Sequence, residues 1–203
     1  EPSTRTRMSF ETAMQRLGGR VVSAVGIESS SLSKGETLYD TGKIVENYAD
    51  IVAMRHPHDG STAELAEGCN VPVINAGDGA GEHPSQSLLD LFTMQRELRK
   101  IDGLTIAMVG DLKFGRTVHS LALMLSHYDA ELIFVSPSEL KMPEYVQRVL
   151  KEKSVRYKET ADMNEAIKWA DVLYMTRIQQ ERFASEGEYK KHRNQYILTR
   201  DEV

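Results

Sequence analysis

Hydroxyl and guanidinium side chains are concentrated in Ser3-Thr4-Arg5-Thr6-Arg7, which opens a helical pattern of apolar residues. Unpaired amide N–H groups and the helix dipole favour an anion at the start of a helix. Arginine adds a planar fork of donors that matches phosphate oxygens. The segment is therefore a candidate phosphate site, although these residues alone fit an N-cap followed by solvated charge equally well.

Further arginines stand where strands are expected to end or helices to begin. Arg55 and Arg177 each follow an apolar, strand-like stretch, and Arg116 opens a helical pattern. Open α/β sheets bind ligands at the carboxyl ends of their strands. Together with Arg5, these side chains indicate a cleft for a polyanion, although each one taken singly fits a surface residue without a role.

His83 stands between a glycine-rich loop and a helix predicted to begin at Pro84. A histidine at this place can hydrogen-bond developing oxyanion charge, whereas a lone histidine is more often a structural residue. No second His, Cys or carboxylate has the spacing of a zinc site. A metal enzyme is therefore not expected, and we expect no cofactor either.

The segment from Gly110 to Thr117 resembles a nucleotide-binding P-loop, because two glycines flank four residues. Arg116, however, stands in the position of the essential lysine. Asp111 would place a carboxylate beside bound phosphates, where like charges repel. The G-x-G-x-x-G pattern of a dinucleotide turn is absent as well, so a nucleotide-binding oxidoreductase or NTPase is a minor alternative.

The elements that position these side chains alternate between strand and helix. Apolar, β-branched stretches predict buried parallel strands at 21–25, 51–54, 71–74, 104–109, 132–135 and 172–175. Helical patterns are found at 37–48, 61–67, 84–98, 116–128, 143–153 and 163–169, and a first helix begins near Ser3 or Thr4 and ends before Gly18-Gly19. This alternation predicts an α/β protein with parallel sheets.

The polar stretch 99–103 follows a long predicted helix, ends in glycine, and is the candidate domain boundary. It divides the chain into residues 1–100 and residues 101–203. We expect two parallel-sheet α/β domains, with the active site in the cleft between them.

The composition excludes several classes of function. A net charge of -5 argues against a general nucleic-acid binder, which needs a clustered basic surface. No apolar run approaches the roughly 18 residues of a membrane span, so no membrane partner is expected. The lone Cys69 permits no intrachain disulfide and fits a reducing, cytoplasmic compartment.

A series of motifs extends over nearly the whole chain. The motifs are Ser3-Thr4-Arg5-Thr6-Arg7-Met8-Ser9-Phe10-Glu11, Lys34-Gly35-Glu36-Thr37, Met54-Arg55-His56-Pro57, Asn75-Ala76-Gly77-Asp78-Gly79 with His83-Pro84-Ser85-Gln86, and Met175-Thr176-Arg177-Ile178-Gln179. In this order they resemble the aspartate carbamoyltransferases. The first motif alone would identify only carbamoyltransferases in general.

The resemblance implies transfer of a carbamoyl group from carbamoyl phosphate to L-aspartate, a step of de novo pyrimidine biosynthesis. It implies that the phosphate is held by Ser3, Thr4, Arg5 and Thr6. It further implies that Thr6, Arg55 and His83 polarise the carbonyl group. Gln86 is implied to contact the carbamoyl amine.

The resemblance also implies how aspartate and the subunits meet. Arg116, Arg177 and Gln179 match the residues that read the two carboxylates of aspartate. Ser31 and Lys34 resemble a loop that reaches into the active site of a neighbouring chain, where Lys34 would contact both substrates. The family builds its sites between the subunits of a homotrimer, and regulatory chains are a further partner that the resemblance leaves open.

The family places Glu1 and Arg182 near Arg116, in a link between the two domains. This sequence differs from the family pattern in three places. One lysine precedes Gly35 where some members have two, Phe114 replaces a common tyrosine, and the chain stops before an H-P-L-P segment. The phosphate motif stands at the very start of the chain, and the H-P-L-P segment is missing at its end. We therefore expect a first domain that is N-terminally incomplete and a second domain that is C-terminally incomplete.

Two alternatives stay open beside this family. Ornithine carbamoyltransferases share the phosphate motif, but their H-P-C-Q cysteine is Ser85 here, their D-x-W-x-S-M-G motif is absent, and Arg116 with Arg177 disfavours a cationic substrate. A non-catalytic, carbamoyltransferase-like assembly domain is the second alternative. A decayed site of that kind would be expected to lose some of Arg5, Arg55, His83 and Arg177.

Overall fold

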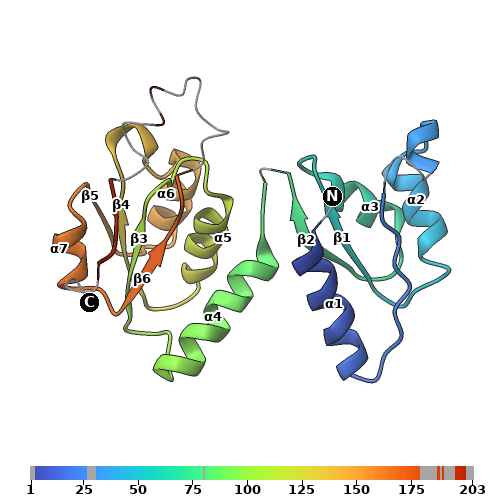
Figure 1. Ribbon diagram of the computed structural model, residues 1–203, viewed down its shortest axis with the longest axis horizontal. Coiled ribbons are helices and arrows are strands. Elements are labelled where there is room, and N and C mark those ends of the chain that lie inside the picture. The colour runs from blue at the N-terminus through green and yellow to red at the C-terminus, as the bar shows by residue number, and fades with distance from the viewer. Residues whose placement is uncertain are drawn as a thin grey trace. The chain divides into compact units, whose positions relative to one another are not determined.

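The computed structural model describes residues 3–26, 31–79, 81–178, 187, 189 and 195–199 (Figure 1). It divides into two compact units, Glu1–Ser85 and Gln86–Val203. Parallel strands alternate with helices in both units, which confirms the predicted α/β class. The boundary predicted between residues 100 and 101 would instead place α4 (Pro84–Leu98) in the first domain, and it stays a prediction.

The first unit contains a two-stranded parallel sheet and its flanking helices. Its elements are α1 (Thr4–Arg16), the 3-10 helix η2 (Ser31–Lys34), α2 (Leu38–Val45), β1 (Val52–His56), α3 (Ser61–Gly68) and β2 (Val73–Asp78). The two strands are in register from Val52 opposite Val73 to His56 opposite Asp78. Their carboxyl ends therefore lie at the same edge of the sheet. Compared with the prediction, β1 begins one residue later and β2 begins two residues later.

Helix α1 begins where the sequence predicts. Ser3 has extended backbone angles, and its side chain caps the helix by accepting a hydrogen bond from the Thr6 amide at 3.4 Å. The helix ends at Arg16, and Gly18 follows with a positive φ of 83°. The Ser-Thr-Arg-Thr segment is thus the first turn of α1.

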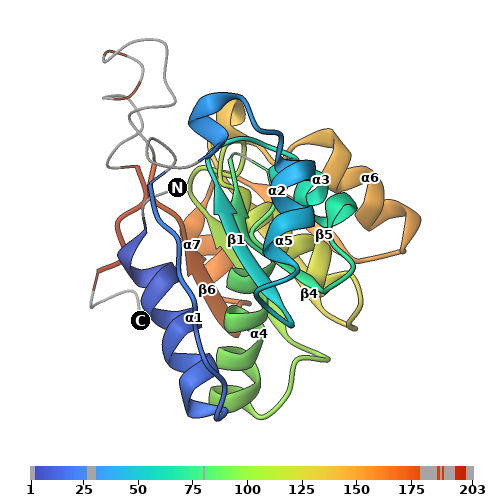
Figure 2. The same ribbon diagram turned by 90° about the vertical axis from the view of Figure 1, so that its right-hand side faces the viewer.

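Helices α2 and α3 lie side by side in both views of the molecule (Figures 1 and 2). A Cβ atom at Gly42 would lie 2.6 Å from the Leu65 carbonyl oxygen, and one at Gly68 would overlap the carbonyl group of Tyr39. Glycine at both positions lets the two backbones approach closely. The Cys69 thiol donates to the Gly42 carbonyl oxygen at 3.4 Å across this contact.

The prediction of a strand at 21–25 is wrong. Residues 19–26 have no regular secondary structure, and the side chains of Val21, Val22 and Val25 are exposed. A strand needs a neighbour that pairs its backbone N–H and C=O groups. Within the described part of the first unit, the sheet consists of β1 and β2 alone, so β-branched composition was not sufficient to form a strand there.

The second unit contains a four-stranded parallel sheet in the order β5-β4-β3-β6. Its strands are β3 (Thr105–Val109), β4 (Glu131–Val135), β5 (Tyr157–Thr160) and β6 (Val172–Met175). Besides α4, its helices are α5 (Arg116–Leu125), the 3-10 helix η3 (Ser138–Leu140), α6 (Glu144–Glu152) and α7 (Met163–Ile167). Every helix predicted in this half is present, and β6 and α4 have the predicted bounds.

Side chains along the central strands point alternately to the two faces of the sheet, and each face has its own hydrophobic core. Ile106 and Met108 of β3 face the cluster formed with α4, α5 and α6. Ala107 and Val109 face the opposite cluster, which includes Met163 of α7. Strands buried on both faces read as continuous apolar runs, which is why β3 and β4 could be predicted from the sequence.

Strand β5 was not predicted. Its sequence, Tyr-Lys-Glu-Thr, is polar, and its residues are only partly buried or exposed because it is an edge strand. Edge strands carry charged residues that hide the apolar signal. Apolar periodicity alone therefore could not detect it.

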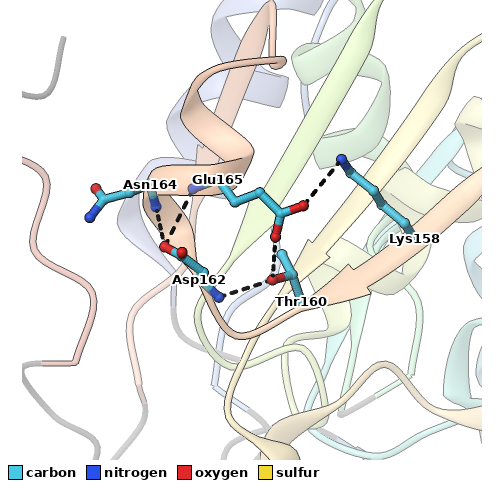
Figure 3. Close-up of polar contacts among 5 residues, drawn as sticks. All are labelled: Lys158, Thr160, Asp162, Asn164 and Glu165. Carbon is cyan, nitrogen blue, oxygen red and sulfur yellow. Dashed lines mark hydrogen bonds and ion pairs between the residues drawn. The ribbon is translucent and has the colours of Figure 1, made fainter.

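A polar cluster that joins β5 to the helix after it fixes the start of α7 (Figure 3). Asp162 caps the helix by accepting hydrogen bonds from the amides of Asn164 at 2.9 Å and Glu165 at 3.3 Å. Thr160 Oγ1 accepts from the Asp162 amide at 3.1 Å and donates to Glu165 Oε2 at 3.0 Å, and Lys158 lies 3.8 Å from the other oxygen of Glu165. These groups satisfy one another, so the cluster is a helix start and not a ligand site.

Among the described residues, no helix is both long and apolar enough to cross a membrane. The same residues also contain no group of three or more His, Cys, Asp or Glu side chains that could hold a metal ion.

Candidate active site

The start of α1 and the end of β1 meet through side chains. Ser3 Oγ donates to Thr6 Oγ1 at 2.9 Å, and Arg55 Nη1 donates to the same Thr6 oxygen at 3.0 Å. Thr6 and Arg55 are half-buried, whereas Thr4 and Arg5 in the first turn of α1 are exposed. We call Ser3, Thr4, Arg5, Thr6 and Arg55 the phosphate corner.

The phosphate corner has the donors that an anion needs. The first amide groups of a helix have no intrahelical acceptor, and the helix dipole adds partial positive charge there. Arg55 brings a guanidinium group to this point from a strand 49 residues away in sequence. Arg5 supplies a second guanidinium from the helix itself, so a doubly charged phosphate group fits this corner.

The buried side chain of His56 anchors the end of β1 beside Arg55. Its Nδ1 accepts a hydrogen bond from the His58 amide at 3.2 Å and lies 2.6 Å from Ser61 Oγ. An amide N–H can only donate, so Nδ1 carries no proton and the Ser61 hydroxyl also donates to it. Burial, followed by the charge of His58, lowers the pKa of His56. The strand end is thus held by a neutral imidazole.

The buried carboxylate of Asp78 holds the loop that leads to His83. Asp78 Oδ2 accepts from the Gly60 amide at 3.1 Å, and Oδ1 accepts from the Asn75 side chain at 3.1 Å and from the Glu82 amide at 3.2 Å. The loop after β2 is therefore tied to the loop after β1. Three accepted hydrogen bonds satisfy this buried charge.

His83 itself is half-buried, and its Nδ1 lies 3.4 Å from Ser85 Oγ. It precedes Pro84, the first residue of α4, as the sequence predicts. Asp78, which positions its loop, belongs to the Asn75-Ala76-Gly77-Asp78-Gly79 motif, but the motif alone does not predict this role. The local signal was an Asn-x-x-Asp pair flanking a glycine turn, which forms side-chain to backbone bonds readily.

Gln86 lies in the first turns of α4 and is held by Asp90. Gln86 Nε2 donates to Asp90 Oδ1 at 2.9 Å, and the Tyr174 hydroxyl of β6 donates to Asp90 Oδ2 at 3.0 Å. Burial raises the pKa of Asp90, although these two hydrogen bonds oppose the shift. Burial and the charge of Asp90 raise the pKa of Tyr174 to about 12.

Arg116 and Arg177 lie at one edge of the second sheet. Arg116 is the first residue of α5 after β3, and Arg177 follows β6, the parallel neighbour of β3. The Asp111 amide donates to Thr176 Oγ1 at 2.9 Å, which ties the two loops together. We call Arg116 and Arg177, with the loops that carry them, the arginine edge.

The loop before Arg116 does not have the free amides of a P-loop. Asp111 Oδ1 accepts from the amides of Lys113 at 3.1 Å and Phe114 at 2.9 Å, so the loop's own carboxylate occupies donors that would otherwise cradle phosphates. Buried His119 further fixes the loop, because its Nε2 lies 2.7 Å from the Leu112 carbonyl oxygen. This geometry disfavours nucleotide binding, as the sequence also predicts.

The remaining predicted site residues are described only in part or not at all. Lys34 is exposed at the end of η2, and only the backbone of Ser31 is described. Glu1, Gln179 and Arg182 lie outside the described residues. Their predicted roles, and those of the phosphate corner and the arginine edge, stay predictions.

Family models match both halves of the chain. Residues 1–96 match the carbamoyl-P binding domain of aspartate/ornithine carbamoyltransferase, and residues 102–203 match the Asp/Orn binding domain of that family. The two matches together extend over almost every residue of the chain.

Curated relatives are aspartate carbamoyltransferase catalytic subunits. The subunit of Leptospira biflexa is 55% identical over 203 residues, which is 100% of this chain and 65% of that protein. The subunit of Methanocaldococcus jannaschii is 50% identical over 204 residues, covering 100% of this chain and 67% of that protein. The chain thus spans about two thirds of the length of these relatives.

Solved structures agree with the sequence matches. The catalytic subunit of M. jannaschii aspartate transcarbamoylase has a TM-score of 0.91 at 50% identity, covering 100% of this chain and 67% of that one. Aspartate transcarbamoylase from Trypanosoma cruzi, in complex with carbamoyl aspartate and phosphate, has a TM-score of 0.86 at 40% identity, covering 100% of this chain and 65% of that one.

The resemblance predicted from the motifs is therefore confirmed. The chain belongs to the aspartate/ornithine carbamoyltransferase family, among the aspartate carbamoyltransferase catalytic subunits.

Proposed function

We propose that this chain carries the active-site residues of an aspartate carbamoyltransferase. The enzyme converts carbamoyl phosphate and L-aspartate to N-carbamoyl-L-aspartate and phosphate, in de novo pyrimidine biosynthesis. The observation that carries the proposal is the 3.0 Å hydrogen bond from Arg55 to Thr6, which joins a guanidinium to the helix start of the phosphate corner. The T. cruzi relative solved with carbamoyl aspartate and phosphate supports the same reaction.

In this reaction the phosphate corner holds the phosphate group, and Thr6, Arg55 and His83 polarise the carbonyl oxygen. The amine of aspartate attacks the carbonyl carbon, and its lone pair forms the new C–N bond. The resulting oxyanion collapses, the C–O bond to phosphate breaks, and the amine passes a proton to the departing phosphate. The carbonyl is already activated, so orientation and oxyanion stabilisation suffice without a covalent nucleophile.

The arginine edge reads the second substrate. Arg116 and Arg177 each offer a fork of donors to one carboxylate of aspartate, and Gln179 adds a polar contact. Ornithine would bring a cation to the same edge, where two guanidinium groups repel it. Glu1 and Arg182 link the domains near Arg116 in this proposal.

The active site is shared between the subunits of a homotrimer. Lys34, exposed on η2, and Ser31 reach into the site of a neighbouring chain and contact carbamoyl phosphate there, and Lys34 also contacts aspartate. Regulatory chains are further candidate partners. The enzyme works in the cytoplasm, which fits its lone cysteine.

An assay of the full-length protein with each amino acid tests the function. Carbamoylation of aspartate, with no product from ornithine, is the expected result. Carbamoylation of ornithine but not aspartate would overturn the proposal, and so would the absence of both activities, which would favour an assembly domain.

A bisubstrate mimic that joins a phosphonate to aspartate tests the site itself. Wild type should bind it tightly, because it engages the phosphate corner and the arginine edge at once. Arg177→Ala should weaken the mimic by about 10- to 100-fold, since a charge-assisted bidentate contact is lost. Inorganic phosphate should bind both proteins equally, and a matching loss for phosphate would contradict the assigned role of Arg177.

A further inference from the structure

The side-chain amide of Gln86 is held in one orientation. Its Nε2 donates to Asp90 Oδ1, one helical turn further along α4, at 2.9 Å. An ionised carboxylate only accepts hydrogen bonds, so the amide nitrogen and not the amide oxygen must face Asp90. The oxygen, Oε1, is turned away from Asp90, and it accepts no hydrogen bond from the residues that the structure describes.

Asp90 is itself fixed from a second element. The Tyr174 hydroxyl on β6 donates to Asp90 Oδ2 at 3.0 Å. Each carboxylate oxygen of Asp90 thus has its own donor, which prevents the carboxylate from turning. The pKa of Tyr174, raised to about 12, keeps its hydroxyl protonated and able to donate at neutral pH.

We propose that Asp90, fixed by Tyr174, is a positioning residue that makes Gln86 a hydrogen-bond acceptor and thereby selects a carbamoyl group by its amine. The inference rests on the proposed function, in which Gln86 faces the carbamoyl amine. Carbamoyl phosphate offers N–H donors to Oε1 at that point. Acetyl phosphate has nearly the same shape but presents a methyl group, which leaves the acceptor unpaired.

Without Asp90, the amide of Gln86 could turn over. Its NH2 group would then face the amine of carbamoyl phosphate, and two donors would oppose each other. Asp90→Asn tests this point with almost no change in volume, because the new amide nitrogen can donate to Gln86 Oε1 and favour the wrong orientation. Tyr174→Phe is a second, milder variant, which removes only the hydroxyl that fixes Asp90.

The test compares three ligands in the full-length enzyme. The measurements are KM for carbamoyl phosphate and the inhibition constants of acetyl phosphate and inorganic phosphate against it. In Asp90→Asn, the preference for carbamoyl over acetyl phosphate should fall about tenfold, the size of one well-placed hydrogen bond to a ligand. Inhibition by inorganic phosphate, which has no amine, should stay within about twofold of wild type.

Matched controls separate positioning from general damage. Thr93→Ala removes a hydroxyl from the exposed face of α4, where it bonds only the Leu89 carbonyl. Tyr157→Phe removes a tyrosine hydroxyl on β5, the edge strand opposite β6, where it donates to Gln147 Oε1. Both should keep the wild-type preference, while Tyr174→Phe should lose about threefold of it.

The outcomes distinguish the inference from the function beneath it. An active Asp90→Asn enzyme with unchanged preference would overturn the inference alone, as would equal weakening of all three ligands. If Asp90→Asn does not fold, Tyr174→Phe decides in the same way. A wild-type protein that neither binds carbamoyl phosphate nor carbamoylates aspartate would overturn the proposed function together with the inference.

Discussion

The phosphate corner of the first unit and the arginine edge of the second unit are held in place by different means. Thr6 and Arg55 meet through a hydrogen bond between side chains, and α1, which carries Thr6, has no buried residue in the described structure. Arg116 and Arg177, by contrast, follow strands β3 and β6, and β3 is almost fully buried between helices.

This difference indicates where substitutions should act. A corner built from polar side chains can lose its chemistry while the fold survives, because few apolar contacts depend on it. The positions of the two arginines in the arginine edge depend on the packing of the sheet beneath them. In such a close-packed core, even a small change in side-chain volume lowers stability. We therefore expect losses of activity from the first region and losses of stability from the second.

The largest effect should come from Phe134→Ala in β4. Phe134 is 1% exposed, and its removal should lower the free energy of unfolding by about 3–5 kcal/mol, because a cavity remains in the core. Denaturant unfolding measures the loss. Phe92→Ala on α4, where the side chain is 65% exposed, is the matched control and should change stability by about 0.5 kcal/mol or less. Equal losses in both variants would break the comparison.

His83→Ala should act on turnover rather than on stability. Losing one donor to the oxyanion should raise the barrier by about 2.7–4 kcal/mol, or about 10²- to 10³-fold in kcat. Phosphate affinity should change far less. His127→Gln is the control, because His127 is exposed and bonds only the side chain of Lys153. Normal turnover in His83→Ala would refute the role given to it.

Ser3→Ala should have a smaller effect on both quantities. Loss of the α1 cap should cost about 1 kcal/mol of stability, and release of Thr6 should raise KM for carbamoyl phosphate. Thr37→Ala removes the equivalent cap of α2, where Thr37 accepts from the Asp40 amide at 3.0 Å. That control should lose similar stability and keep KM. If both variants raised KM alike, Ser3 would have no specific role in the corner.

The smallest effect should be a pH dependence of stability from His56. Its pKa is lowered in the folded state, so below about pH 6.5 the unfolded chain binds more protons than the folded one. Stability should therefore fall as the pH drops from that value toward the folded pKa. His56→Asn, whose amide oxygen can replace Nδ1 as acceptor, should remove this part of the slope in denaturant unfolding. An unchanged slope would contradict the neutral anchor.

Much of the second unit could be predicted because its strands are buried on both faces. The apolar runs of β3, β4 and β6 and the periodicity of α4 are strong local signals. Two errors have a common cause. The segment 21–25 is apolar without a described pairing partner, and β5 is paired without being apolar, since strand pairing depends on neighbours distant in sequence.

For the candidate site, the sequence predicted the residues proposed to contact ligands but not the residues that hold them in place. Motifs identified the groups that would touch ligands, such as Arg55 and His83, because their residue types are rare and chemically specific. Asp78, which holds the loop of His83, and Asp90, which holds Gln86, are ordinary acidic residues in sequence. The fold shows their role, since their partners Gly60 and Tyr174 lie 18 and 84 residues away.

The close contact of α2 with α3 gives the first unit a chemical reporter. Cys69 is the lone cysteine of the chain, and burial raises the pKa of its thiol while Gly42 accepts its hydrogen bond. Within this chain, a thiol reagent would therefore modify only the sulfur of Cys69, and it would do so faster when α2 separates from α3 than when the helices stay packed. The labelling rate would record how often this helix pair opens, with no engineered probe.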